Sequence, residues 1–127
     1  AIDSDGVKIP DVWLYDAQGR TSLYHSKDCD AVYMLLSPVS LKLLLHIAGR
    51  MSAGKDWYKL NKDLFCRLAG VSSHNTYNKA VNELVRYCVI IGTHYKDVYW
   101  INPMFMFNGD RCKKYPNNIR VISEREL

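Results

Sequence analysis

Residues 70–90 combine a regular apolar skeleton with many amide and hydroxyl side chains: GVSSHNTYNKAVNELVRYCVI. The apolar members recur at i, i+4, i+7 and i+11, the pattern of one buried stripe on an α-helix. They are Tyr77, Val81, Leu84 and Cys88. The sequence therefore predicts a helix that begins near Ser72 or Ser73 and packs one side against a core.

A second set of residues in this stretch lies two positions before each apolar residue. On an α-helix this offset is roughly 200°, so these residues face outward together. They are Asn75, Lys79, Asn82 and Arg86, with His74 and Asn78 beside them. An ordinary solvated face mixes Glu with Lys, whereas here Glu83 is the single acid of the predicted helix. This composition favours contact with an anionic partner.

Two further helices precede this one. Ser37 and Pro38 are typical of a helix start, and apolar residues at helical spacing continue to Met51, so we expect residues 52–54 to end that helix. After a short predicted strand at residues 57–60, Asn61 is placed to cap a helix over residues 62–69. Gly70 then supplies the left-handed residue after its end.

A β-hairpin is predicted after the polar-faced helix. Residues 89–94 and 98–101 are rich in β-branched and aromatic side chains, and residues 95–97 form a connection short enough for a hairpin. Pro103 must lie at or beyond the end of the second strand. We expect Trp57 and Trp100 to pack in this small sheet, and Tyr77 to belong to the core rather than to stack on a base.

The terminal regions are less regular. Residues 12–15 and 21–25 flank a turn sequence at 16–19 and predict an N-terminal hairpin, while residues 31–36 suit a strand and a helix equally. Turns are expected at Asn108-Gly109 and at residues 116–118, and residues 119–122 form a candidate last strand.

The order of these elements, helix, strand, helix, sharp turn, polar-faced helix and hairpin, is the layout of a winged helix-turn-helix. The residues that resemble the recognition-helix signature of that superfamily are Leu68 to Ser72, Thr76, Ala80 to Leu84, and Val89-Ile90. The resemblance implies an α+β fold, a winged helix-turn-helix with an N-terminal β-hairpin and a C-terminal extension. We therefore expect a single domain over residues 1–127, with residues 1–36 as the N-terminal hairpin and extension, 37–102 as the winged-helix core, and 103–127 as the C-terminal extension.

A narrower resemblance follows the predicted wing. Residues 100–109, WINPMFMFNG, are similar to the "INP", aromatic and Gly segment of RepL-type plasmid replication initiators. This resemblance implies a DNA-binding protein that starts replication at a plasmid or phage origin and meets host replication proteins. Winged helices also serve as transcriptional regulators and as protein-interaction modules, and both remain alternatives.

DNA recognition explains the residue types of the outward face. An Asn amide pairs with adenine in the major groove, Arg reads guanine or meets phosphate, Lys meets phosphate, and hydroxyls with free amides at a helix start bind phosphate. The candidate DNA-binding residues are Lys62, Ser72, Ser73, His74, Asn75, Thr76, Asn78, Lys79, Asn82, Arg86 and Lys96. Ser72 or Ser73 acting purely as a helix cap is the alternative, and Lys59 is a further flanking cation. Lys113 and Lys114 form either a solvated basic pair or a phosphate contact.

Charge and composition fit this partner class. Residues 1–30 hold six acids and three bases, a net charge of −3, so the remainder of the chain carries +7. No apolar run approaches a membrane span, and the chain opens without Met, signal peptide or lipidation motif, so we expect a processed or trimmed cytoplasmic protein with no membrane partner.

Cysteine and histidine positions argue against metal and enzyme chemistry. Four cysteines lie far apart and are expected as free thiols, and His25 with Cys29 supplies too few ligands for a metal. The four histidines are isolated and no hydrolase or phosphate-loop motif is present, so we expect no enzymatic activity and no cofactor.

A homodimer is expected on double-stranded DNA, because one recognition helix reads few base pairs. The candidate dimer surfaces are the N-terminal hairpin, the apolar helix after Ser37, and the aromatic stretch around Phe105 and Phe107.

Overall fold

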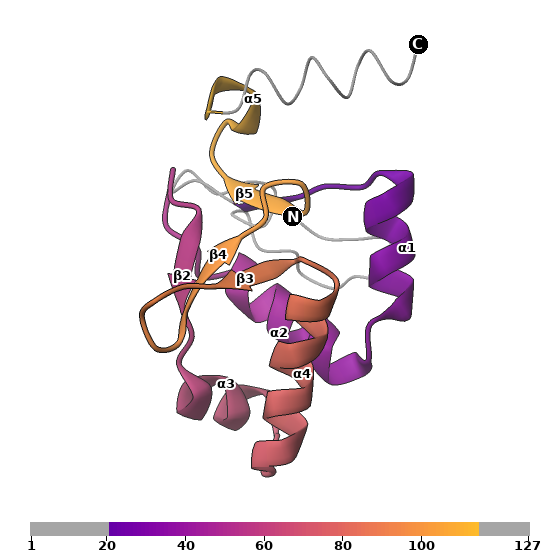
Figure 1. The fold of residues 1–127 in the computed structure, drawn as a ribbon, viewed down its shortest axis with the longest axis vertical. Coiled ribbons are helices and arrows are strands. Elements are labelled where there is room, and N and C mark those ends of the chain that lie inside the picture. Colours follow the sequence, from indigo (N-terminus) through magenta and orange to yellow (C-terminus); the bar gives the residue numbers. More distant parts are fainter. Residues whose placement is uncertain (1–20, 115–127) are drawn as a thin grey trace, which may run out of the picture.

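The computed structural model describes residues 21–114 of the chain, and its elements form an α+β arrangement. Figure 1 shows helices packed beside two small antiparallel sheets. In chain order the elements are β1 (Thr21–Leu23), α1 (Lys27–Leu35), α2 (Pro38–Ala48), β2 (Trp57–Lys59), α3 (Lys62–Ala69), α4 (His74–Arg86), β3 (Ile90–Gly92), β4 (Val98–Ile101), β5 (Met106–Asn108) and α5 (Arg111–Lys114).

Helix α2 forms the centre of the core and begins as the sequence predicts. The Ser37 side chain accepts a hydrogen bond from the Ser40 N–H, and Pro38 occupies the first turn. The predicted end at residues 52–54 is wrong, because the helix ends at Ala48 with Gly49 as its cap. Met51 is buried in the following loop rather than in the helix, and its carbonyl accepts a hydrogen bond from Asn108 Nδ2 at 2.9 Å.

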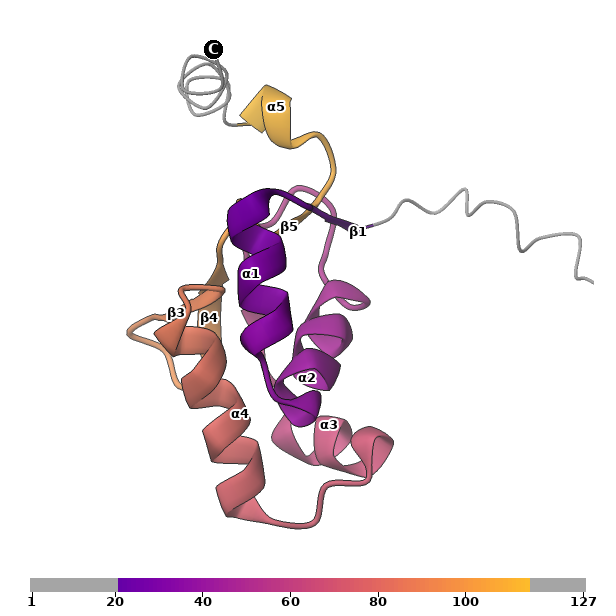
Figure 2. The same ribbon diagram turned by 90° about the vertical axis from the view of Figure 1, so that its right-hand side faces the viewer.

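Residues 31–36, which suit a strand and a helix equally, lie mostly in helix α1. The Ser26 side chain accepts a hydrogen bond from the Cys29 N–H, and Asp28 and Asp30 lie in the first turn. Acidic side chains at that end of a helix are favoured by the helix dipole. Local capping therefore determines the structure of a segment whose apolar run was ambiguous. Figure 2 shows α1 beside α2, and Figure 1 shows α1 on the side of the molecule away from the β3–β4 connection.

Helices α3 and α4 are joined by a tight turn whose residues match the prediction. Asn61 caps α3, and Gly70 follows it with φ +71° and ψ +29°, in the left-handed region. The Val71 N–H donates to the Cys66 carbonyl at 2.9 Å, which closes the turn. The Ser73 side chain then caps α4. In Figures 1 and 2, α3 and the start of α4 form the end of the molecule opposite β1 and β5.

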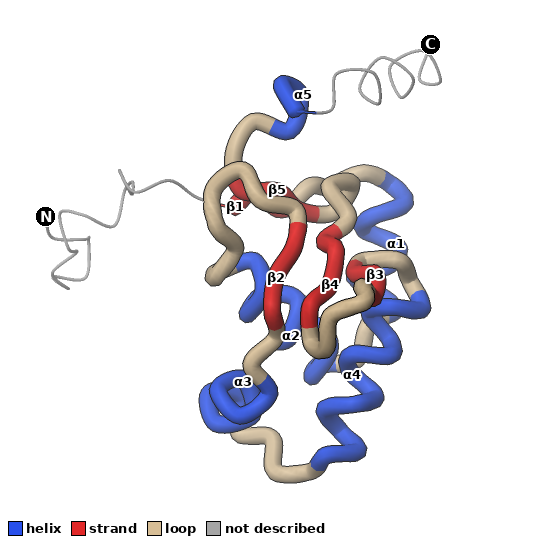
Figure 3. The backbone as a smooth tube through the Cα atoms, turned by 60° about the vertical axis from the view of Figure 1, so that its left-hand side comes forward, coloured by secondary structure: helices blue, strands red, loops and turns tan. Residues whose placement is uncertain are grey.

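The larger sheet has strand order β2-β4-β3 and is antiparallel throughout. The predicted hairpin corresponds to β3 and β4, and Pro103 lies beyond the end of β4 as expected. Figure 3 shows the three strands side by side, with α2 behind them. The strands place Ile90 and Ile101 against the core and their alternate neighbours on the outer face.

The smaller sheet pairs β1 with β5, which the sequence did not predict as a strand. Thr21 lies opposite Asn108 and Leu23 opposite Met106. The other strand and the turn of the expected N-terminal hairpin, residues 12–20, lie outside the described residues, as do the turn at 116–118 and the strand at 119–122. Because β5 is buried, the start of the C-terminal extension belongs to the core.

The buried stripe of α4 is shorter than predicted. Tyr77, Val81 and Leu84 are buried, but Cys88 is exposed. The helix ends at Arg86, and Cys88 takes the left-handed conformation with φ +60°, which turns its side chain outward and brings Val89 into the core. The element order and sheet topology that result are compatible with a winged helix.

Candidate nucleic-acid interface

The outward face of α4 is exposed as the sequence predicts. Its polar residues that lie in solvent are His74, Asn75, Asn78, Lys79, Asn82 and Arg86. On the opposite side, buried residues of the helix pack against α2 and β3. Tyr77 belongs to that buried side, and burial raises its pKa to about 12, with smaller contributions from nearby anionic forms including Tyr99 and Asp97. Tyr77 therefore packs the inner side of α4 against the core.

Glu83, the acid of α4, is turned away from this face. Its Oε1 accepts a hydrogen bond from the Ser37 backbone N–H at 2.6 Å, at the start of α2. A carboxylate at a helix amino terminus is stabilised by the exposed N–H groups and the helix dipole. The contact fixes α4 on α2 and leaves the exposed face of residues 74–86 without a carboxylate of its own.

The first turn of α4 gathers several of the predicted residues. The Ser73 side chain accepts a hydrogen bond from the Thr76 N–H at 3.4 Å, so Ser73 is the helix cap. Ser72 is exposed and Thr76 is half-buried. Lys62, from the first turn of α3, lies with its Nζ 3.5 Å from His74 Nε2. The turn at Gly70 therefore brings a cation from one helix to the amino terminus of the next.

Other predicted residues lie apart from this cluster. Arg86 is at the far end of α4, with its guanidinium carbon 5.8 Å from the centre of the Tyr87 ring. Lys96 is exposed in the β3–β4 connection, which Figure 1 shows reaching away from α4. Lys59 is exposed on β2. The structure thus groups Lys62 with the start of α4 and leaves Lys96 on a separate projection.

Two sequence interpretations of aromatic residues are wrong. Trp57 and Trp100 lie opposite each other in the larger sheet, but on its outer face, where they are 40% and 48% exposed rather than packed against the core. Phe105 and Phe107 are buried and offer no dimer surface. The pairing of β5 with β1 places this segment inside the fold, where the consecutive residues Met106 and Phe107 are both buried.

The remaining dimer candidates differ in exposure. Most apolar residues of α2 are buried, although Leu45 remains exposed on it. Met34 and Leu35, which no sequence pattern marked as surface contacts, are exposed at the end of α1. The third dimer candidate was the N-terminal hairpin, of which the described residues include just β1, the strand that pairs with β5.

The residues of the WINPMFMFNG segment make structural contacts. Asn102 Nδ2 donates to the Cys88 carbonyl at 2.9 Å, and Asn102 Oδ1 accepts from the Met104 N–H at 3.0 Å. The first bond ties the residue after β4 to the turn that follows α4. Asn102 thereby joins the predicted recognition helix to the predicted wing.

Potential metal ligands are engaged elsewhere. His25 Nδ1 lies 2.8 Å from Asp30 Oδ1, while the buried Cys29 thiol donates to the Met104 carbonyl at 3.3 Å. Within residues 21–114, no three His, Cys, Asp or Glu side chains gather as a metal site would need. Lys114 donates to the Gly54 carbonyl at 2.8 Å and lies 3.8 Å from Asp56 Oδ2, so it is not simply solvated. Among the described residues no helix is both long and apolar enough to span a bilayer.

Comparisons of this chain with protein-family models, curated proteins and solved structures found no match.

Proposed function

We propose that this protein is a winged helix-turn-helix protein that binds double-stranded DNA in a sequence-specific manner, with α4 as the recognition helix. The observation that carries the proposal is the composition of the exposed face of α4, whose polar side chains are amides, cations and His74, while Glu83 is held against Ser37. An α-helix fits the major groove of B-DNA, where Asn and Arg side chains reach base edges.

The arrangement around α4 supports the same proposal. Gly70 and Ser73 set a short connection between α3 and α4, and α3 then places Lys62 beside His74 at the start of α4. Cations and free N–H groups at that end suit a phosphate of the DNA backbone. We assign Lys62, Ser72 and Ser73 to docking on phosphate, and Asn75, Asn78 and Asn82 to base reading.

The biological role that we propose is initiation of replication at a plasmid or phage origin, with host replication proteins as partners. The resemblance of residues 100–109 to RepL-type initiators supports this role. Transcriptional regulation is the alternative, and it would use the same helix on a promoter. We also propose a homodimer on paired half-sites, for which exposed Met34, Leu35 and Leu45 are now the candidate contacts.

The proposal is tested by fluorescence anisotropy with duplex DNA selected from a random pool. Lys79→Ala is expected to weaken binding to all sequences and to lower the slope of log affinity against log salt by about 0.9, the value for one phosphate contact. Asn78→Ala is expected to reduce preference for the selected site by about 1 to 3 kcal/mol. Lys27→Ala removes an exposed cation from the start of α1 and serves as the control.

Two results separate the alternatives. Absence of duplex affinity at low salt would refute DNA binding and favour a winged helix used as a protein-interaction module. Sequencing of the genomic fragments that the protein retains distinguishes the two DNA roles, since an initiator selects a replication origin and a regulator selects promoters.

A further inference from the structure

The outer face of the larger sheet carries a row of large apolar side chains. The register places Trp57 of β2 directly opposite Trp100 of β4, and Trp100 opposite Ile91 of β3. Residues paired across neighbouring antiparallel strands share one face of a sheet. The three side chains therefore form one row across all three strands, on the face opposite the buried Ile90 and Ile101.

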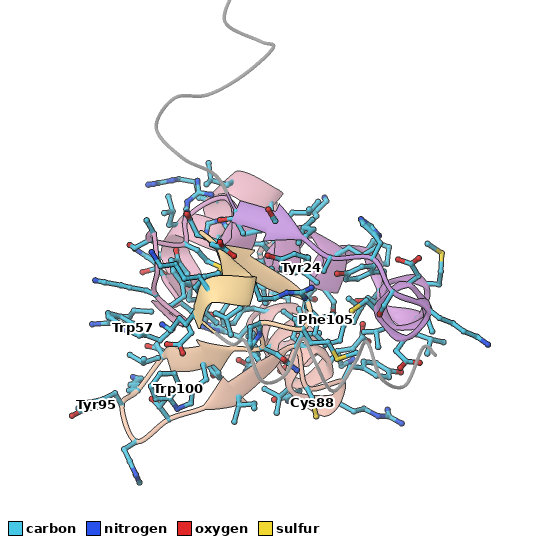
Figure 4. All side chains as sticks on the ribbon, turned by 90° about the horizontal axis from the view of Figure 1, so that it is seen from above. Tyr24, Trp57, Cys88, Tyr95, Trp100 and Phe105 are labelled. Atoms are coloured by element: carbon cyan, nitrogen blue, oxygen red, sulfur yellow. The ribbon has the colours of Figure 1, made fainter. Side chains whose placement is uncertain are left out.

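This row remains open to solvent among the described residues. Ile91 is 51% exposed, and Tyr95 in the β3–β4 connection is 75% exposed. Tyr95 and the two tryptophans border a groove of about 640 Å³, which is also lined by Gly92, Thr93, His94 and Val98. Figure 4 shows Trp57, Trp100 and Tyr95 together on one side of the molecule, well apart from Cys88. Contiguous exposed apolar surface of this kind marks binding sites more often than plain surface.

The connection that carries Tyr95 is held in shape by Thr93. Thr93 Oγ1 donates to the Val98 carbonyl at 2.8 Å and accepts a hydrogen bond from the Tyr95 N–H at 3.1 Å. Asp97 takes a left-handed conformation with φ +63°, and its carbonyl accepts a hydrogen bond from the Leu60 N–H at 2.7 Å. The loop is thus tied to both neighbouring strands, so that Tyr95 is presented on an ordered backbone.

Cations border the aromatic groove. Lys55 Nζ lies 4.9 Å from the centre of the Trp57 ring. Lys59 lies opposite Val98 in the register, and because it is two residues after Trp57 it is on the same face of β2 as Trp57. Exposed Lys96 follows Tyr95 in the β3–β4 connection. In the segments 55–60 and 90–101 the acids are Asp97 and Asp56, and Asp56 lies 3.8 Å from Lys114 Nζ. The local charge balance is positive around an aromatic surface.

We propose that this groove binds unpaired bases of a single-stranded nucleic acid. Aromatic side chains provide stacking surfaces for bases, and neighbouring lysines provide contacts for the phosphates between them, which is the combination that single-strand binding requires. Paired bases within a duplex are already stacked and do not present their faces to such a surface. The lysine border favours a polyanion over a second copy of this chain or an apolar peptide.

This site is separate from the outward face of α4. It uses β2, β4 and the β3–β4 connection, whereas the duplex site proposed above uses the first turn and exposed side of α4. The two sites would let one molecule hold a duplex and an adjacent unpaired strand. Either site can exist without the other.

The test measures binding of a fluorescent oligothymidine of about 12 nucleotides by anisotropy at low salt, together with quenching of tryptophan emission. Trp57→Leu and Trp100→Leu keep an apolar side chain of strand-compatible size and remove the ring. Each is expected to weaken single-strand binding roughly 5- to 100-fold. Tyr95→Ala, at a highly exposed position, tests the same groove with little effect on folding. Lys27→Ala removes an exposed cation at the start of α1, outside the groove, and is expected to change single-strand binding little.

Several outcomes overturn the proposal. One is that the oligonucleotide does not bind to the wild-type protein, although circular dichroism shows that the protein is folded. Another is that all three groove variants bind it as the wild type does. A third is that Lys79→Ala weakens single-strand binding while the groove variants do not, which would assign the strand to α4. Sedimentation that shows a dimer lost in Trp100→Leu, without strand binding, would assign the face to a second copy. Loss of duplex binding alone leaves the groove proposal intact, so the two proposals fail separately.

Discussion

Replacing Gly70 by Ala isolates the backbone cost of the turn between α3 and α4. Gly70 has φ +71°, and a Cβ added there would meet no atom within 4 Å. The substitution therefore causes no clash, and its cost is that of holding an L-residue in the left-handed region, about 1 to 2 kcal/mol. Because the turn positions α4, this cost measures how firmly the chain specifies the angle between the two helices.

Gly92→Ala is the matched control. A Cβ at Gly92 also meets nothing within 4 Å, but Gly92 has no positive φ. Both substitutions remove glycine freedom from the unfolded chain, which stabilises the folded state by about 0.4 to 1 kcal/mol in each variant. This contribution cancels in the comparison. The free energy of unfolding of Gly92→Ala should therefore exceed that of Gly70→Ala by about 1 to 2 kcal/mol.

Urea titrations followed by far-ultraviolet circular dichroism measure this difference, provided that both variants give the same dependence on denaturant. Equal unfolding free energies would refute the reasoning, because they would mean that residue 70 does not hold a left-handed conformation. The connection between α3 and α4 would then need another geometry, and the placement of Lys62 beside His74 would fall with it.

Three further substitutions test the contacts that support α4 and the core. Glu83→Ala should lower the free energy of unfolding by about 1 to 3 kcal/mol, because it leaves the half-buried Ser37 N–H without its acceptor. Glu83→Gln keeps an acceptor and should lose less stability, and equal stability of Glu83→Ala and wild type would contradict the contact. Ser73→Ala should cost about 1 kcal/mol in thermal unfolding, since it removes the cap of α4, whereas Ser72→Ala should cost little. Burial, with a smaller contribution from the Arg50 charge, holds the pKa of His46 below its ordinary value of 6.5. The unfolded chain therefore binds one proton more than the folded protein below about pH 6.5, and the free energy of unfolding should fall as the pH drops through that value. Urea titrations of His46→Leu should show a weaker fall, and identical pH profiles for variant and wild type would refute this assignment.

The starts of α2, α3 and α4 and the end of α3 were predictable because their determinants are local. Ser37 with Pro38, Asn61, Gly70 and Ser73 each act within one turn of their own position. A cap satisfies N–H groups three residues away, and a left-handed glycine closes bonds to the preceding turn. The outward direction of Asn75 and Lys79 followed equally from helical geometry, because one buried stripe fixes the opposite face.

The errors concern contacts between distant parts of the chain and a backbone conformation that residue type does not signal. Strand β5 forms because β1, more than eighty residues earlier, pairs with it, and no local pattern around Met106 carries that information. Cys88 was assigned to the buried stripe because nothing in its residue type signals φ +60°. A strand pattern likewise gives two faces without saying which one the core covers. Trp57 and Trp100 fell on the uncovered face, where large aromatic residues are not expected.

The most direct test of the proposed function adds a negative charge to the exposed face of α4. Asn82→Asp changes one amide to a carboxylate of almost the same size at an exposed position, while Lys27→Ala changes the net charge by the same amount at the start of α1. If α4 lies in the major groove, Asn82→Asp should weaken binding of the selected duplex by about tenfold or more at low salt, because a carboxylate would face the DNA phosphates. Lys27→Ala should bind almost as the wild type does, and both variants should melt at the wild-type temperature. Equal duplex affinities for Asn82→Asp and Lys27→Ala would contradict the account.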